Sequence, residues 1–261
     1  MHLIILSLFA CRNAVPPPMS DTQRNPSSEW RRLLEEVVND DGLVDYNLLE
    51  SRRDILDRYV SWIAQNGPHS NKMTSRDENK KIAFYMNSYN ALVMYSVLEN
   101  RPLESVSDVD VGVYTASNVG FFFGQVFLVD GEWMSLYHLE MERLLGNFHY
   151  PMIHAGLNCA SKGCPPPKYY THIKLDTALE NSLEDFLKSP NGARFEDGEW
   201  YLSELFQWYE KDFTRWSHAE TLCEYLIPFS EQPLSDWLSE HKDNCNFETF
   251  SYDWSLNEVS P

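Results

Sequence analysis

The chain has 261 residues, of which 43% are hydrophobic and 14% aromatic. This composition is typical of a folded protein with an aromatic-rich core and excludes a disordered chain. The 39 acidic residues outnumber the 21 Lys and Arg and give a formal net charge of -18. Because so acidic a surface repels phosphate backbones and anionic lipid head groups, we expect no nucleic-acid partner.

The first eleven residues have features of an export signal. Residues 1–10 form a short apolar run, and the L-F-A-C box that ends at Cys11 resembles a bacterial lipoprotein cleavage site. The run has no Lys or Arg before it, so a plain tail on a cytoplasmic protein stays open as the alternative. We expect an exported protein, either periplasmic or a lipoprotein whose lipid on Cys11 is its only contact with a membrane. Residues 12–28, rich in Pro and polar residues, are expected to form a flexible tether.

Apolar residues recur at helical spacing through the first part of the folded region. They predict helices at 29–38, between 44 and 63, and at 77–98. The tripeptides N-G-P and N-R-P end the last two of these helices.

The pattern changes at residue 111. Residues 111–129 are rich in Val, Phe and Gly and predict either two strands joined through Gly124 or one bulged strand, before a hairpin turn at D-G-E-W. Ser135 is the predicted cap of a helix through Leu145, and 151–158 is predicted to be a buried strand. A second hairpin is expected at 195–202, with further helices at 175–187, 203–213, 218–229 and 234–241. Together these elements predict a helix-rich α+β single domain over 29–258, with one small antiparallel or mixed sheet.

The segment H-A-G-L-N-C-A-S-K-G-C-P-P-P at 154–167 concentrates reactive side chains in one loop. It holds two of the chain's 5 Cys. In an exported protein the four cysteines after the first permit two disulfides, and Cys159–Cys164 with Cys223–Cys245 is the most local of the three pairings. In the cytoplasm all four would be thiols.

Four segments together resemble a known family. They are A-F-Y-M-N-S-Y-N-A-L at 83–92, S-L-Y-H-L-E at 135–140, the loop motif at 154–166, and Y-L-S-E-L-F-Q-W-Y-E-K-D-F at 201–213. Through them the chain is similar, over residues 30–257, to the family catalogued as domain of unknown function 547. The resemblance implies export or lipid anchoring, as in bacterial members, but no activity. The family commonly carries I-E-H where this chain has Leu139-Glu140-Met141, so a histidine base at that position would be missing here.

A thiol-dependent reaction on an amide or thioester is the first functional hypothesis. It needs Cys159 as the thiolate nucleophile, His154 as the base or orienting group, and Asn158 with loop N–H groups as oxyanion donors. On a strand at 151–158, His154 and Asn158 share a face, whereas a contact between His154 and Cys159 requires the chain to turn.

A disulfide between Cys159 and Cys164 supports two other hypotheses. A redox-active pair would carry out thiol–disulfide exchange, although C-x-x-x-x-C differs from the C-x-x-C of thioredoxin-like sites. A structural bond would instead shape the recognition loop of a non-enzymatic binding module for an unidentified small molecule or peptide. A metal site that adds His154 is disfavoured, because zinc ligands are usually closer in sequence and occur with a matching second pair.

Other candidate site residues lie on two helices and on the loop. Asn87 and Asn90 share one face of a helix that is apolar almost all round, so their amides must bond a neighbouring loop or a ligand. Glu140 lies near an apolar helix face and is either an acid/base group, or one that orients the loop histidine, or a solvated carboxylate. Ser161 and Lys162 are candidate binding residues, and Lys162 suits an anionic group.

Motifs for other chemistry are missing. The sequence contains no G-x-G-x-x-G, P-loop, G-x-S-x-G or H-E-x-x-H. We therefore expect no cofactor and no metal, and whether the protein is an enzyme stays open.

Overall fold

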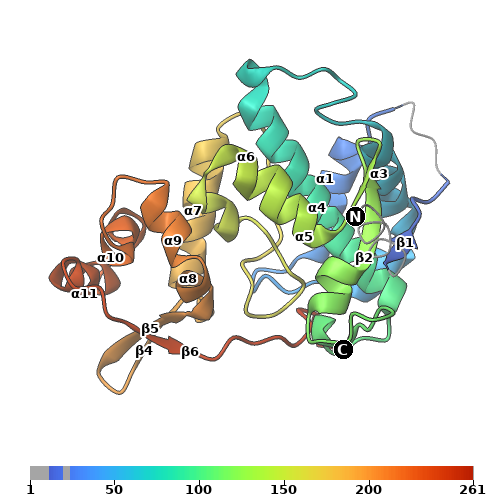
Figure 1. Cartoon of the computed structure of the whole chain (residues 1–261). Coiled ribbons are helices and arrows are strands. Elements are labelled where there is room, and N and C mark those ends of the chain that lie inside the picture. Colours follow the sequence, from blue (N-terminus) through green and yellow to red (C-terminus); the bar gives the residue numbers. More distant parts are fainter. Residues whose placement is uncertain (1–11, 20–23, 261) are drawn as a thin grey trace, which may run out of the picture.

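Residues 12–19 and 24–260 are described by the structure, a computed structural model (Figure 1). The signal-peptide or lipoprotein prediction for residues 1–11 falls outside this part of the chain. Within it, no helix is at once long enough and apolar enough to cross a bilayer.

Helix α4 (Glu78–Asn100) lies at the centre of the fold. Every residue from Met86 to Leu98 is buried, because this helix is apolar on all sides and other elements surround it. Helices α1 (Ser27–Val37), α2 (Tyr46–Ser51) and α3 (Arg53–Gln65) form a group beside it, with α3 packed on α4. The first three predicted helical regions are therefore confirmed, with small shifts at their ends.

The remaining helices are shorter than α4, and those labelled furthest left in Figure 1 lie away from it, at the end of the molecule that holds the second sheet. The α-helices are α5 (Leu136–His138), α6 (Gly146–Phe148), α7 (Leu175–Lys188), α8 (Glu204–Trp208), α9 (Glu210–Arg215), α10 (Leu222–Leu226) and α11 (Leu234–His241). Single turns of 3-10 helix are η2 (Ser75–Asp77), η3 (Val106–Asp108), η6 (Pro151–Ala155) and η7 (Ile227–Phe229). Two π-helical segments are η4 (Gly120–Gly124) and η5 (Leu139–Leu145).

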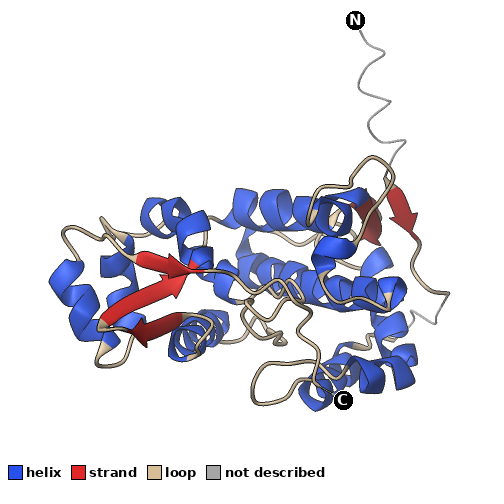
Figure 2. Cartoon of the chain, turned by 90° about the horizontal axis from the view of Figure 1, so that it is seen from below, coloured by secondary structure: helices blue, strands red, loops and turns tan. Residues whose placement is uncertain are grey.

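Two small mixed sheets lie at opposite ends of the molecule (Figures 1 and 2). One contains β1 (Asn13–Val15), β2 (Gln125–Val129) and β3 (Glu132–Met134), and the other contains β4 (Ala193–Glu196), β5 (Glu199–Ser203) and β6 (Glu248–Phe250). Each sheet has one parallel and one antiparallel pair. The predicted class, a helix-rich α+β domain, is confirmed, with two sheets where one was expected.

Both predicted hairpins form at Asp-Gly turns. Asp130 and Gly131 have φ angles of 49° and 83°, and Asp197 and Gly198 have φ angles of 52° and 89°. Two consecutive left-handed residues are what a two-residue turn needs to match the twist of its strands, and Asp-Gly supplies them at low cost.

The segment predicted as a buried strand at 151–158 is instead the 3-10 helix η6. Pro151 starts it, at a position where a missing N–H costs nothing. All five residues of η6 are buried, and a short run of buried apolar residues does not by itself distinguish a strand from a helix. The Val, Phe and Gly-rich stretch differs similarly: Gly120 to Gly124 are π-helical, and only Gln125–Val129 form a strand.

Part of the expected tether is ordered. Asn13–Val15 form β1, which pairs in parallel with β2 and buries Val15. This strand covers the edge of β2 that the β3 hairpin leaves unpaired. The remainder of 12–28 has no strand up to α1, in the part that the structure describes.

Residues 251–260 run from β6 toward the N-terminal helices (Figures 1 and 2). On the way they bond to the cysteine loop: Lys162 N–H donates to Ser255 O at 2.9 Å, and Asn257 N–H donates to Ala160 O at 3.0 Å. Asn257 O in turn accepts from the N–H of Val44 at 2.7 Å. The C-terminal segment thus ties the loop to the N-terminal helices.

The two asparagines of α4 hold the same loop from the other side. The Asn87 amide forms a two-way bond with Tyr170, donating to its carbonyl at 2.7 Å and accepting from its N–H at 2.8 Å. The Asn90 amide donates to Gly156 O at 3.0 Å and accepts from Asn158 N–H at 2.9 Å. Both side chains are buried, so they replace the strand or helix partners that an irregular buried backbone would otherwise lack.

Replacing Asn90 should destabilise the fold. In Asn90→Ala the N–H of Asn158 and the carbonyl of Gly156 lose their partner while buried, and we expect a loss of about 1–3 kcal/mol in the free energy of unfolding. Urea denaturation followed by circular dichroism measures it. Asn181→Ala, on the exposed side of α7, is the matched control and should change stability by less than about 0.5 kcal/mol. Equal stability of the two variants would contradict the role given to Asn90.

Candidate functional site

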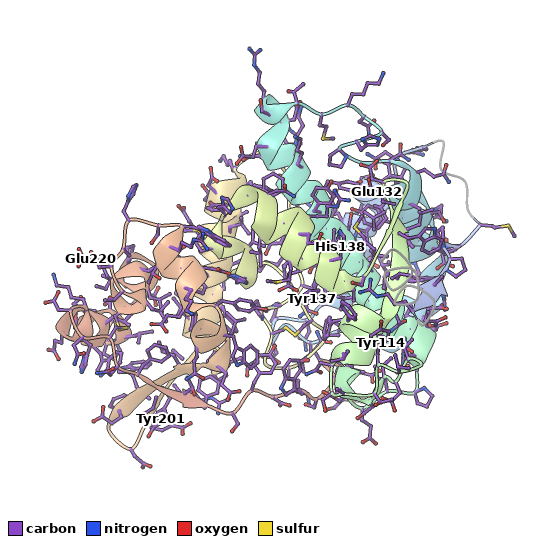
Figure 3. All side chains as sticks on the ribbon, in the orientation of Figure 1. Tyr114, Glu132, Tyr137, His138, Tyr201 and Glu220 are labelled. Carbon is purple, nitrogen blue, oxygen red and sulfur yellow. A yellow bond between two sulfur atoms is a disulfide. The ribbon has the colours of Figure 1, made fainter. Side chains whose placement is uncertain are left out.

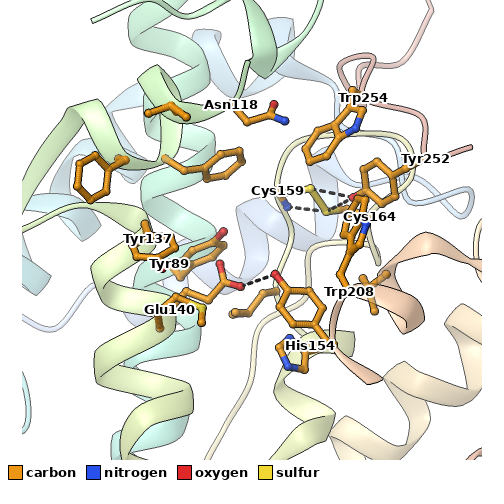
Figure 4. Close-up of a pocket in the computed structure, with 17 residues that line it drawn as sticks. Tyr89, Asn118, Tyr137, Glu140, His154, Cys159, Cys164, Trp208, Tyr252 and Trp254 are labelled. Atoms are coloured by element: carbon orange, nitrogen blue, oxygen red, sulfur yellow. Dashed lines mark hydrogen bonds between the residues drawn. A yellow bond between two sulfur atoms is a disulfide. The ribbon is translucent and has the colours of Figure 1, made fainter. Parts of the chain in front are cut away.

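A cavity of about 470 Å³ lies between the α5–η5 segment and the cysteine loop (Figure 4). In the close-up Tyr89, Tyr137 and Glu140 are on one side, and the disulfide, Trp208, Tyr252 and Trp254 are on the other. About half of the residues in its wall are aromatic. They are Tyr89, Phe122, Phe123, Tyr137, Trp208, Tyr209, Tyr252 and Trp254.

Cys159 and Cys164 form a disulfide in this wall, with an S–S distance of 2.03 Å. Cys223 and Cys245 form a second one, so the most local of the three predicted pairings is confirmed. The prediction of a Cys159 thiolate nucleophile does not describe this structure, because the sulfur is already in a covalent bond and has no free thiol to ionise.

Tyr252 joins the disulfide to the aromatic wall. Its hydroxyl donates to Cys164 Sγ at 2.9 Å and lies 3.0 Å from Cys159 Sγ. Burial and, after it, the charge of Glu140 raise the pKa of Tyr252, so the phenol keeps the proton that it donates. Gly163 allows this arrangement, since a Cβ there would lie 2.9 Å from the tyrosine ring.

His154 is directed away from the disulfide. Its Nε2 lies 2.9 Å from Asp212 Oδ2, and its ring stacks on Tyr209 with centroids 3.7 Å apart. The imidazole stands well apart from Cys159 in Figure 4. The turn that the Cys–His hypothesis required therefore does not bring these two side chains together, and the partner that orients His154 is Asp212.

Glu140 faces the cavity from the π-helix η5. Its Oε1 accepts a hydrogen bond from the Tyr209 hydroxyl at 3.1 Å, and the Tyr89 hydroxyl is a second partner. The carboxylate charge is the largest cause that raises the pKa of Tyr209, followed by burial. Glu140 thus contacts the ring that stacks on His154, and not the imidazole itself.

His138 does not take the place of a missing histidine beside Glu140. Its Nε2 pairs with Glu142 at 3.3 Å, and the side chain leaves the helix in a different direction from Tyr137, which lines the cavity (Figure 3).

The other loop residues predicted as binding groups lie outside the cavity lining. The Asn158 amide is buried, donates to Pro165 O at 2.8 Å and accepts from Ala160 N–H at 3.0 Å. It therefore stabilises the loop and does not face the cavity as an oxyanion donor would have to. Ser161 is buried, and its hydroxyl finds no partner within the described residues. Lys162 is half-buried beside the C-terminal segment. The space beside Gly156 is occupied by the Met86 side chain and is not open for a ligand next to His154.

Sequence reasoning missed four residues of the site: Tyr209, Asp212, Tyr252 and Trp254. Tyr209 and Asp212 stand in the 201–213 segment noted for its family resemblance, and Tyr252 and Trp254 stand in Y-D-W at 252–254. Their aromatic content was explained by core packing, and nothing local indicates that an Asp 58 residues away would bond His154. In the described part of the chain, no three His, Cys, Asp or Glu side chains are grouped to hold a metal ion.

Residues 73–187 match the family model described as "Protein of unknown function, DUF547". The match confirms the predicted resemblance to this family over that segment of the chain. No curated protein and no solved structure matches the chain.

The segment that matches DUF547 contributes only part of the cavity lining. It contains α4, Glu140, His154 and the disulfide, whereas Tyr209, Asp212 and the aromatic residues Trp208, Tyr252 and Trp254 lie C-terminal to it. One wall of the cavity thus belongs to the segment that matches DUF547, and most of the opposite aromatic wall comes from the segment that follows.

Removing the charge of Glu140 should lower the pKa of Tyr209 toward the ordinary tyrosine value of about 10, because that charge is the largest cause of the rise. A pH titration of ¹³Cζ-labelled tyrosine by NMR measures it in Glu140→Gln, with Tyr209→Phe to assign the signal. Because the pKa of Tyr209 is higher in the folded than in the unfolded chain, the free energy of unfolding falls as the pH rises above about 10, and it stops falling once the folded tyrosine has also ionised. In Glu140→Gln this fall should therefore end at a lower pH. Glu142→Gln, an exposed neighbour, is the control. An unchanged Tyr209 titration in Glu140→Gln would contradict the contact.

Proposed function

We propose that this chain binds a small molecule in the aromatic cavity, and that the Cys159–Cys164 disulfide shapes the wall of this binding site. The observation that carries the proposal is the cavity itself. Its volume of about 470 Å³ lies within the range of small-molecule sites. Its lining combines apolar rings with a few polar groups, which is the usual composition of such sites.

The surroundings of the disulfide favour a structural role. The loop is bonded by Asn90 on one side and by the C-terminal segment on the other. The disulfide further restricts the turn between Cys159 and Cys164. The hydrogen bond from the Tyr252 hydroxyl to Cys164 holds an aromatic ring beside this disulfide. A wall fixed in this way costs little ordering when a ligand binds.

The two disulfides also support an exported protein, because cytosolic thiols are normally kept reduced. We propose a periplasmic or lipid-anchored location on this ground. The intact mass of the mature chain from its native host would test it, since cleavage before Cys11 and an added lipid both change that mass.

Nile red, a neutral dye whose fluorescence rises in apolar surroundings, is a suitable first probe of the cavity. We expect Trp254→Ala to weaken its binding about tenfold, since loss of that ring removes about 1.4 kcal/mol of contact. Trp133→Ala, in exposed β3 outside the cavity lining, is the matched control and should bind as the wild type does. Urea denaturation checks that both variants fold. Absence of dye binding, or equal binding by both variants, would count against the cavity as a ligand site.

Thiol–disulfide exchange is a second candidate, favoured by one observation. Cys164 Sγ accepts hydrogen bonds from the Tyr252 hydroxyl and, at 2.9 Å, from the Cys159 N–H. These donors would stabilise a thiolate on Cys164 if a substrate thiolate attacked the Cys159 sulfur from the cavity. The new bond would join the substrate sulfur to Cys159, and the Cys159–Cys164 bond would break, leaving Cys164 as the thiolate.

The reduction potential decides between these two functions. After equilibration in glutathione or dithiothreitol buffers, alkylation and mass spectrometry give the oxidised fraction of each pair, with Cys223–Cys245 as the internal reference. For a structural bond we expect a potential below about -300 mV. A potential near about -200 mV, lowered in Tyr252→Phe, would overturn the structural role and favour exchange. The thiol-nucleophile hypothesis needs reduced Cys159, so it requires Cys159 in Cys164→Ser to alkylate at a pH well below about 8.5.

A further inference from the structure

We propose that the cavity binds its ligand through a highly alkylated ammonium group, held between Glu140 and the rings of Trp208 and Trp254. This inference rests on the ligand-binding role proposed above and names the chemical class of the ligand.

The charge of the cavity is the first argument. No Lys or Arg contributes to the lining, and within the described chain Glu140 forms no salt bridge with any Lys, Arg or His. His154, which also lines the cavity, is already paired with Asp212. Glu140 is a half-buried carboxylate with only phenol donors as partners, so a cationic ligand would supply the charged partner that the protein does not.

The aromatic wall is the second argument. Trp208 and Trp254 stack with ring centroids 5.7 Å apart, and Tyr252 lies 4.6 Å from Trp254. Trp208 is 46% exposed despite its size, so part of its ring is open to a ligand. Faces of Trp and Tyr attract cations through their negative π-electron density, and grouped rings are the usual receptor for alkylated ammonium groups.

Phe123 shows that a ring of this cavity attracts cations within the protein itself. The guanidinium of Arg12 lies over it, 3.8 Å from the ring centroid. Because that ring already has a cation, the rings of Trp208 and Trp254, which lie across the cavity from Glu140, are the ones that a ligand would use (Figure 4).

The hydrogen-bonding capacity of the wall limits the type of cation. A primary ammonium has three N–H donors that need acceptors when buried. The lining offers the Glu140 carboxylate, which already accepts from two tyrosines, and otherwise mostly apolar rings. An alkylated ammonium has few or no N–H groups to satisfy and covers the rings with methyl or methylene groups. The net charge of -18 would also raise the local concentration of any cation.

Choline and its neutral carbon isostere, 3,3-dimethyl-1-butanol, test the inference on the oxidised full chain. Isothermal titration calorimetry and tryptophan fluorescence measure binding of each. We expect choline to bind at least about tenfold more tightly than the isostere and to weaken as salt is added. Glu140→Gln should cost choline about tenfold while the isostere is unaffected, and Glu142→Gln, exposed and outside the lining, should change neither.

The outcomes separate the inference from the function on which it rests. Equal affinity for choline and the isostere would overturn the ammonium inference and leave the cavity as a ligand site. Nile red binding without choline binding would do the same. Failure of all three probes in folded protein would overturn both. Choline binding that is lost in Trp254→Leu and in Glu140→Gln would support both.

Discussion

Buried irregular backbone is the constraint on which the rest of this structure depends. The loop at 154–167 runs through the interior, where its N–H and carbonyl groups have no water and no continuous strand or helix to pair with. Asn90, Asn158 and Asn257 supply the missing partners, and the last two also bond to each other through their amides at 3.3 Å. The Asn90 and Asn158 amides each carry both a donor and an acceptor, which lets one side chain satisfy two backbone groups, whereas Asn257 bonds the loop through its own backbone N–H.

The cavity follows from that arrangement. The loop is fixed against α4, so the C-terminal segment that bonds to it must pass along the same side, and this places Tyr252 and Trp254 opposite Glu140. The disulfide closes the loop at the point where Tyr252 contacts it. The hydrogen-bonded loop holds the walls, and the groups that line the cavity include the aromatic rings, the disulfide and the Glu140 carboxylate.

The sequence predicted those parts of the fold whose causes are local. The Asp-Gly turns, the Ser135 and Ser203 helix caps and the apolar α4 were all readable, because each depends on residues within one or two turns of chain. The disulfide pairing was readable for the same reason, since closeness in sequence favours it. Contacts that depend on packing were not: Asp212 reaches His154 across 58 residues, and Tyr252 reaches Cys164 across 88. The buried positions of Asn87 and Asn90 indicated that these side chains must bond some loop. They did not indicate that Asn90 would bond the backbone of Asn158, which was a candidate oxyanion donor.

The predicted helix at 203–213 shows how a local break creates the site. The structure divides it into α8 and α9 at Tyr209, whose φ and ψ of -110° and 13° are not helical. Leu205, Phe206 and Phe213 remain buried on either side, so the apolar pattern looks the same with or without the break. Around the break, the Tyr209 hydroxyl meets Glu140 while Asp212 meets His154 on the far face of the tyrosine ring. Tyr209 therefore lies between two acidic side chains that a continuous apolar wall could not accommodate. Its hydroxyl bonds Glu140, and its ring stacks on the histidine that bonds Asp212. Glu140 therefore remains in the lining of the cavity, and Asp212, outside that lining, pairs with the histidine.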